Sequence, residues 1–185
     1  MSISTVSSIA LFSVFTYIAP ILREATHASL GFVTAMLVTY GLGLTVGNWA
    51  GGKFADRHVD RTLIVTLASL SAILIAFALT MSHAAPTAIL VFAWGVASFA
   101  LVPPLQVRVM AAAADAPNLA SSVNIGAFNL GNAFGAALGG GVIAAGWGYP
   151  AVALAGAVTS AIGLVAVVLA AKRHSSPAYR PSSAI

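Results

Sequence analysis

The chain has 185 residues, of which 59% are hydrophobic and only 6% are charged, and its mean hydropathy is +0.98. A soluble domain has about 25% charged residues, so this composition excludes an ordinary water-soluble fold and indicates an integral membrane protein. The absence of cysteine excludes disulfides, thiolate metal sites and cysteine nucleophiles.

The intervals between charged residues predict the membrane-spanning segments. Residues 1–22, 62–107 and 116–171 contain no Asp, Glu, Lys or Arg, and a charge at the bilayer centre costs about 2.5–3.5 kcal/mol. A spanning helix needs about 20 residues, so each of the two long intervals must hold two helices, divided at residues 81–86 and 146–150. An all-α integral membrane fold is expected, with six spans at 3–22, 30–54, 62–81, 87–110, 119–145 and 150–171. A tail, 173–185, is expected to be cytoplasmic and disordered.

The positions of the basic residues predict the orientation. If the six spans alternate, seven of the eight Lys and Arg residues lie on one side of the membrane, and the eighth, Arg23, lies on the other. The seven are Lys53, Arg57, Arg61, Arg108, Lys172, Arg173 and Arg180. The positive-inside rule therefore places both termini in the cytoplasm. The net charge of +4 is explained by this flanking pattern, so no nucleic-acid partner is expected.

Two of the predicted spans carry stripes of small residues. The span 30–54 has a small residue at every fourth position, and 119–145 repeats the pattern. The members are Gly31, Ala35, Thr39, Gly43, Gly47 and Gly51 in the first stripe, and Ala127, Gly131, Gly135 and Gly139 in the second. Residues four apart share a helical face, and small ones allow a neighbouring helix to approach closely. The stripes therefore predict close helix packing, with chance in an Ala- and Gly-rich chain as the alternative. They occupy equivalent places in the two three-helix halves, which suggests a three-plus-three repeat.

The segment between the second and third spans reads Gly52-Lys53-Phe54-Ala55-Asp56-Arg57-His58-Val59-Asp60-Arg61. It resembles the short cytoplasmic-loop signature of the major facilitator superfamily, a Gly followed by Ala-Asp-Arg, a second Gly and basic residues. Val59 stands where the second Gly is usual, and Asp60 interrupts the basic run. Residues 15–20, 102–108 and 121–132 resemble the C-terminal half of bacterial drug:proton antiporters of the arabinose-efflux-permease type.

This resemblance implies that the six spans correspond to helices 7–12 of a twelve-helix transporter and that a partner, the N-terminal six-helix half, is missing. It further implies that the first and fourth spans line a cavity. The second and fifth would face the other half, so their glycine stripes are expected at that interface. The third and sixth spans would face the lipid bilayer.

Polar and aromatic side chains on the first and fourth spans are therefore the candidates for contact with a small-molecule solute. They are Phe12, Thr16, Tyr17, Trp94, Ser98 and Gln106. Aromatic surfaces with a few polar groups suit apolar or amphipathic solutes. The alternative is that these side chains only pack between helices. Pro103-Pro104 is expected to disrupt the fourth span, because proline removes backbone hydrogen bonds.

The loop signature supplies a second candidate site. Gly52, Asp56, Arg57 and Arg61 are expected to form a conformational latch, meaning a contact that holds the cytoplasmic side closed. Asp56 would lie near the start of the fifth span, where a helix N-terminus stabilises a carboxylate. The alternative is that these residues are ordinary flanking charges.

The sequence contains no catalytic motif, so neither an enzyme nor a cofactor or metal site is expected. The resemblance implies secondary active efflux of a small solute by alternating access, driven by proton antiport, in a bacterial inner membrane. Two alternatives stay open. The chain could be a self-sufficient six-helix protein that forms a homodimeric transporter or channel, or it could be an inactive truncated membrane protein.

Overall fold

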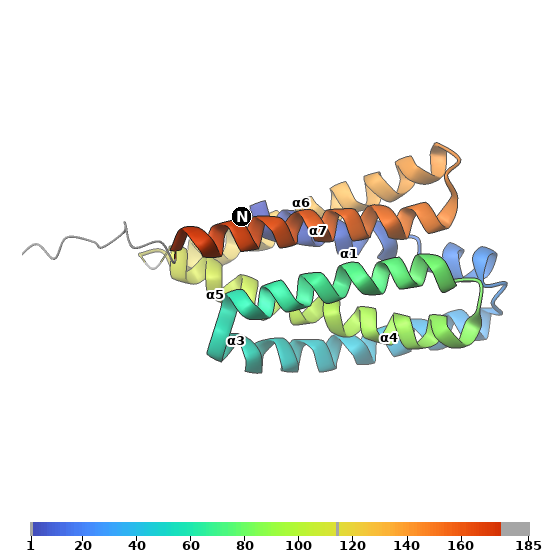
Figure 1. The fold of residues 1–185 in the computed structure, drawn as a ribbon, viewed down its shortest axis with the longest axis horizontal. Coiled ribbons are helices and arrows are strands. Elements are labelled where there is room, and N and C mark those ends of the chain that lie inside the picture. Colours follow the sequence, from blue (N-terminus) through green and yellow to red (C-terminus); the bar gives the residue numbers. More distant parts are fainter. Residues whose placement is uncertain (1, 114, 175–185) are drawn as a thin grey trace, which may run out of the picture.

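The computed structural model describes residues 2–113 and 115–174, and the regular secondary structure of this part consists of helices joined by short connections (Figure 1). The elements are α1 (Ser2–Phe15), α2 (Ile18–Pro20), the π-helical turn η1 (Ile21–Ala25), α3 (Leu30–Thr80), α4 (Ala84–Ala100), α5 (Val102–Ala112), α6 (Pro117–Ala144) and α7 (Gly148–His174). Helix α7, which corresponds to the sixth predicted span, therefore continues to His174, beyond the expected end at residue 171. The rest of the predicted tail, 175–185, lies outside the described residues.

Helix α3 crosses the membrane twice. Its 51 residues would measure about 77 Å if straight, more than twice the roughly 30 Å hydrocarbon core. The helix breaks at His58, whose φ of −151° and ψ of 82° are not helical. Figure 1 shows α3 reversing direction at the left of the view, between its blue-to-teal part and its green part. The arms 30–57 and 59–80 correspond to the second and third predicted spans. With α3 counted twice, the long apolar helices of the described residues give six crossings.

The first and fourth spans are each interrupted, at opposite ends. The first span, Ile3–Ala25, breaks at Thr16 and Tyr17, and Pro20 has no N–H to donate to the Thr16 carbonyl. The fourth span, Ala84–Ala112, is divided at Leu101 into α4 and α5, beside the predicted disruption at Pro103-Pro104, although the φ of −78° and ψ of −29° of Leu101 stay helical. Non-helical backbone at membrane depth is tolerated where protein surrounds it or where it lines a water-filled cavity.

The helices pair as an inverted three-plus-three repeat requires. Helix α1 packs on α6, and the 30–57 arm of α3 packs on α4, so the first span contacts the fifth and the fourth contacts the second. Exchanging the two three-helix halves converts one of these pairs into the other. The 59–80 arm packs on α7, where Ser71 Oγ donates to the Ala157 carbonyl at 3.0 Å and Ser160 Oγ donates to the Leu67 carbonyl at 2.9 Å.

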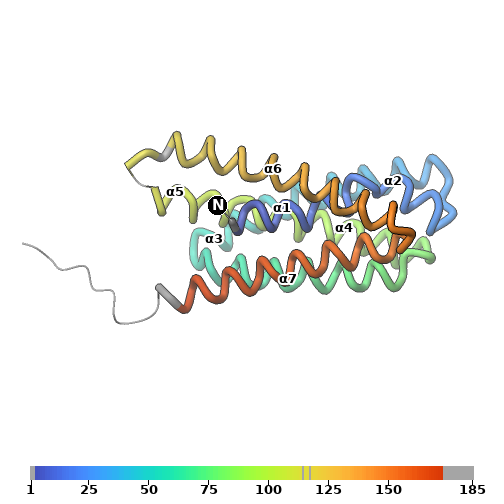
Figure 2. Tube along the Cα trace, turned by 90° about the horizontal axis from the view of Figure 1, so that it is seen from above, coloured from blue at the N-terminus to red at the C-terminus, as the bar shows by residue number. Residues whose placement is uncertain are grey.

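One end of the bundle collects the basic residues. The start of α1, the reversal at His58, the α5–α6 connection and the end of α7 lie at this end, and the other three connections lie opposite (Figures 1 and 2). We call it the basic end, because Lys53, Arg57, Arg61, Arg108 and Lys172 belong to segments that lie there, whereas Arg23 belongs to the opposite end. The side chain of Arg173 and all of Arg180 lie outside the described part.

Candidate functional site

The stripe on the 30–57 arm lies against the backbone of α4. A methyl group added at Gly43 would lie 2.5 Å from the Phe92 carbonyl oxygen, and one at Gly51 would lie 2.5 Å from that of Ala100. A methyl at Gly47 would meet the Val96 carbonyl oxygen. These separations are far inside the roughly 3.5 Å at which carbon atoms attract, so only glycine permits this approach.

The stripe on α6 makes the equivalent contact with α1. Added methyl groups at Gly131, Gly135 and Gly139 would lie 2.5, 2.8 and 2.6 Å from the carbonyl oxygens of Thr5, Ile9 and Ser13. The expectation that the glycine stripes lie at the interface with the other half is therefore corrected. The inverted repeat places the first span against the fifth and the fourth against the second inside one unit, and these contacts occupy the glycine faces.

An aromatic cluster surrounds Trp94 in the centre of the bundle. The Tyr40 ring centre lies 4.5 Å from that of Trp94 and 5.1 Å from that of Phe15, and Tyr40 Oη donates to Ser98 Oγ at 3.3 Å. Trp94 is 1% exposed and Ser98 is 0% exposed. In this arrangement both side chains are enclosed by the helices of this unit, so the structure shows them as packing between helices, and their contact with a solute stays a prediction.

Tyr40 did not figure among the residues selected from the sequence, although it joins the second span to this cluster. Its position one turn before Gly43 was the available signal, because a residue at that spacing faces the same neighbouring helix. The indole N–H of Trp94 is buried and has no hydrogen-bond partner among the described residues.

The candidates on the first span lie around its break. Phe12 and Tyr17 are half-buried, and Thr16 is exposed at the surface of the bundle. Tyr17 Oη donates to the Ala136 carbonyl at 2.8 Å, and Thr16 Oγ1 donates to the Phe12 carbonyl of its own helix at 2.7 Å. These three residues are therefore positioned at the disrupted turn, with Thr16 offering the most open surface.

Gln106 belongs to a chain of polar side chains that joins three helices near the basic end. Its Nε2 donates to Ser121 Oγ at 2.8 Å, and its Oε1 accepts from Asn124 Nδ2 at 2.9 Å. Asn124 Oδ1 in turn accepts from Ser4 Oγ at 2.7 Å. The chain connects α5, α6 and α1, and each interhelical hydrogen bond of this kind contributes about 0.6–2 kcal/mol in a membrane. Of these four side chains, only Gln106 was selected from the sequence. Small hydroxyl side chains such as Ser4 and Ser121 give no comparable signal in a sequence.

An ion pair at the basic end joins Asp60 and Arg108, neither of which was among the candidate latch residues. Arg108 Nη1 lies 2.5 Å from Asp60 Oδ1 and joins α5 to the second arm of α3. Among the described residues Asp56, Arg57 and Arg61 form no ion pair, and all three side chains are exposed. An added methyl at Gly52 would meet nothing within 4 Å. The loop residues selected as a latch are thus presented at the surface, and the contact inside the unit is Asp60–Arg108.

Comparison with known families identifies this architecture. The family model described as Major Facilitator Superfamily matches residues 1–184. The chain belongs to the major facilitator superfamily. Membership accounts for the six crossings, the inverted pairing and the loop signature.

Several major facilitator proteins resemble this chain in sequence. The "Inner membrane transport protein YdhP" of Escherichia coli (strain K12) is 51% identical over 165 residues, which is 89% of this chain and 42% of that protein. The "Uncharacterized MFS-type transporter YfhI" of Bacillus subtilis (strain 168) is 33% identical over 84% of this chain and 39% of that protein. The "Uncharacterized MFS-type transporter YtbD" of the same organism is 36% identical over 70% of this chain and 34% of that protein. The chain therefore spans about two fifths of the length of the curated relatives it matches.

Proposed function

We propose that this chain is the C-terminal half of a twelve-helix secondary transporter that exports a small solute by alternating access. The observation that carries the proposal is the inverted pairing of α1 with α6 and of α3 with α4, together with the interrupted first and fourth spans. Transporter halves are commonly built from such repeats, with discontinuous helices at the binding region. The name of the Escherichia coli relative supports a bacterial inner membrane, and the basic end supports an orientation with both termini in the cytoplasm.

In this proposal the solute contacts the first span near its break. Thr16 is exposed there, and Phe12 and Tyr17 flank it with half-buried aromatic rings. An aromatic surface with one hydroxyl suits an apolar or amphipathic solute. Trp94 and Ser98 then act from behind, as packing that fixes Tyr40 and Phe15.

The basic end supplies the closing contact. Asp60–Arg108 holds the reversal of α3 against α5, and the exposed Asp56, Arg57 and Arg61 are free to meet the other half when the cytoplasmic side closes. Gly52 has open space beside it, which would admit a close neighbour. Opening would then break surface contacts while Asp60–Arg108 persists within this half.

Proton coupling is assigned to the other half. The four acidic residues of this chain are Glu24, Asp56, Asp60 and Asp115, and each lies toward the end of a span or in a connection. Proton relays in membranes generally use Asp, Glu or His within the bilayer. The proton-carrying side chain of an antiporter would therefore reside in the N-terminal half.

Reconstitution tests this function. The purified chain is placed in liposomes with an imposed pH gradient, alone or with the part of the Escherichia coli relative that this chain does not match. Uptake of a panel of amphipathic solutes is then measured. We expect proton-driven flux with both parts and none with this chain alone. Flux by this chain alone would instead support a homodimeric transporter.

A further inference from the structure

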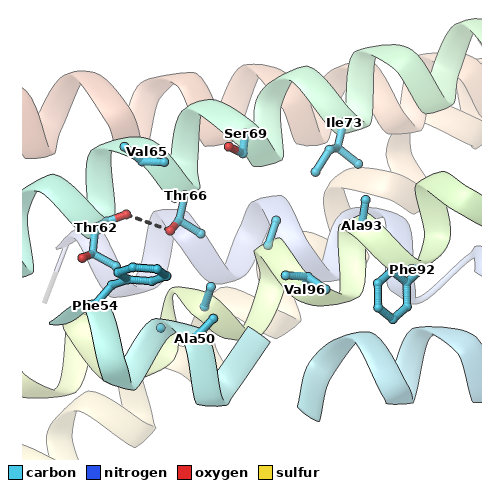
Figure 3. Close-up of a pocket in the computed structure, with 13 residues that line it drawn as sticks. Ala50, Phe54, Thr62, Val65, Thr66, Ser69, Ile73, Phe92, Ala93 and Val96 are labelled. Atoms are coloured by element: carbon cyan, nitrogen blue, oxygen red, sulfur yellow. Dashed lines mark hydrogen bonds between the residues drawn. The ribbon is translucent and has the colours of Figure 1, made fainter. Parts of the chain in front are cut away.

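An apolar groove runs between the two arms of α3 and is floored by α4 (Figure 3). Its volume is about 440 Å³. Figure 3 shows Ala50 and Phe54 on the first arm, Val65, Thr66, Ser69 and Ile73 on the second, and Ala93 and Val96 on α4. Thr66 Oγ1 donates to the Thr62 carbonyl of its own helix at 2.7 Å, so this hydroxyl is satisfied and the groove offers mainly hydrocarbon.

The groove continues into a second hollow at the basic end. This hollow, of about 410 Å³, shares Phe54, Thr62, Val65 and Thr66 with the groove and adds Arg57, His58 and Arg61. One continuous surface thus passes from apolar side chains to two guanidinium groups within a few turns of helix.

The dimensions of this surface fit one leaflet of a bilayer. From Thr62 to Ile73 the second arm rises about 16 Å at 1.5 Å per residue, which is about half of the roughly 30 Å hydrocarbon core. The cations lie at the end of the bundle, where lipid headgroups lie, and the apolar part extends toward the bilayer centre. A lipid acyl chain would therefore be matched in both length and polarity.

The charges around the mouth favour an anion. Asp60 is already paired with Arg108, which leaves Asp56 as the exposed carboxylate next to Arg57 and Arg61. Lys53 lies with its Nζ 5.0 Å from the centre of the Trp49 ring and does not line either hollow. Basic pockets between spanning helices are a known mode of anionic headgroup recognition.

We propose that this groove binds one anionic phospholipid, with an acyl chain along α3 and α4 and the phosphate between Arg57 and Arg61. The arginines then hold a lipid when the cytoplasmic side is open. The bound lipid would contact the 30–57 arm of α3, which carries the glycines that face α4. The packing of this arm would therefore depend on which lipids the cytoplasmic leaflet contains.

The test measures lipid binding without transport. The purified, delipidated chain is titrated with phosphatidylglycerol or with phosphatidylcholine of the same acyl chains, and bound lipid is counted by native mass spectrometry. We expect one phosphatidylglycerol to bind preferentially. Arg57→Gln and Arg61→Gln should each weaken its affinity about fivefold, since each cation near a lipid surface contributes a factor of that size.

Matched variants separate the site from general effects of charge and size. Lys53→Gln removes one positive charge from the same loop outside the groove, and its affinity for phosphatidylglycerol should remain near that of the parent. Ala93→Phe should block the groove floor, whereas Ala137→Phe, at an exposed position on α6, should leave binding unchanged. Circular dichroism confirms that each variant is helical.

Three outcomes would overturn the proposal. Equal binding of phosphatidylglycerol and phosphatidylcholine would remove the charge recognition. An equal loss of affinity for phosphatidylglycerol in Lys53→Gln and in the two arginine variants would show a non-specific attraction between charges. Competition by inorganic phosphate, with Ala93→Phe without effect, would indicate a phosphate site rather than a lipid site.

Discussion

Gly43 of α3 and Gly95 of α4 face each other with their backbones in contact. A methyl group added at Gly43 would lie 3.0 Å from the Gly95 α-carbon, and one added at Gly95 would lie 3.1 Å from the Gly43 α-carbon. Lipid supplies no hydrophobic force between helices, so van der Waals contact at this distance is a principal source of their association. The crossing of these two helices is accordingly sensitive to a single carbon atom.

Gly43→Ala should destabilise the bundle by about 1–3 kcal/mol, because an extra methyl in a packed contact forces the helices apart. The matched control is Gly41→Ala, two residues earlier, where an added methyl meets nothing within 4 Å and helix propensity favours alanine. The measurement is the midpoint of unfolding in mixed detergent micelles. Equal unfolding midpoints for the two variants would contradict a tight contact between α3 and α4 at Gly43.

The inverted repeat predicts a matching effect on α6. Gly139→Ala should lower the unfolding midpoint, because its methyl would lie 2.6 Å from the Ser13 carbonyl oxygen and 2.7 Å from the Tyr17 ring. Gly141→Ala, on the open side of the same helix, should not. If Gly139→Ala is neutral while Gly43→Ala is harmful, the two halves do not share one packing scheme.

Asn124→Ala should cost about 1–2 kcal/mol, since it removes two interhelical hydrogen bonds and leaves Gln106 and the buried Ser4 with unmet polar atoms. Asn129→Ala changes the same residue type at an exposed position of α6 and should stay within about 0.5 kcal/mol. Thermal unfolding measures the stabilities of the two variants relative to the parent chain. Hydrogen exchange should rise at the start of α1 in the first variant only.

Asp60 and Arg108 should show a coupling energy of about 0.5–1 kcal/mol in a double-mutant cycle, since both side chains are partly exposed and surface pairs are worth little. The cycle uses Asp60→Asn, Arg108→Gln and the double variant, with Asp56→Asn as the control for loss of a nearby carboxylate. Because the chain has no cysteine, His58→Cys supplies a single labelling site at the break. Labelling should quicken when the pair is broken and stay unchanged in Asp56→Asn.

The orientation is tested by reporter fusions. A phosphatase fused after Arg180 should be inactive and one fused near His83 should be active, since the enzyme folds only outside the cytoplasm and seven of eight basic residues belong to the opposite side from His83. The reverse pattern of activities would invert the assigned topology.

The sequence predicted an all-helical membrane fold because a charge in lipid is so costly that the spacing of the charged residues marks the long apolar segments. The break at His58 could not be located in the same way, since residues 53–61 contain neither Gly nor Pro and one non-helical residue suffices to reverse the chain. The sequence also could not predict which helices pack against the glycine stripes. A spacing of four defines which face of a helix is small, but not which helix lies against it.

The solute candidates show the same limit. Trp94 and Ser98 share a helical face, and periodicity cannot tell an enclosed face from one that lines a cavity. The Asp60–Arg108 pair depends on residues 48 positions apart, and Asp60 had been read as an interruption of the loop pattern. Local pattern identifies the polar residues, whereas long-range packing decides which of them meet.

The sharp reversal of α3 bears on how the chain enters a membrane. With a single non-helical residue at the turn, the two arms have almost no slack between them and cannot settle at independent depths or tilts. The two arms are expected to leave the translocon together as one hairpin. Its basic tip would remain on the cytoplasmic side, because moving Arg57 and Arg61 through lipid is costly. An insertion of a few residues at this turn would therefore impair insertion into the membrane more than it would destabilise the folded protein.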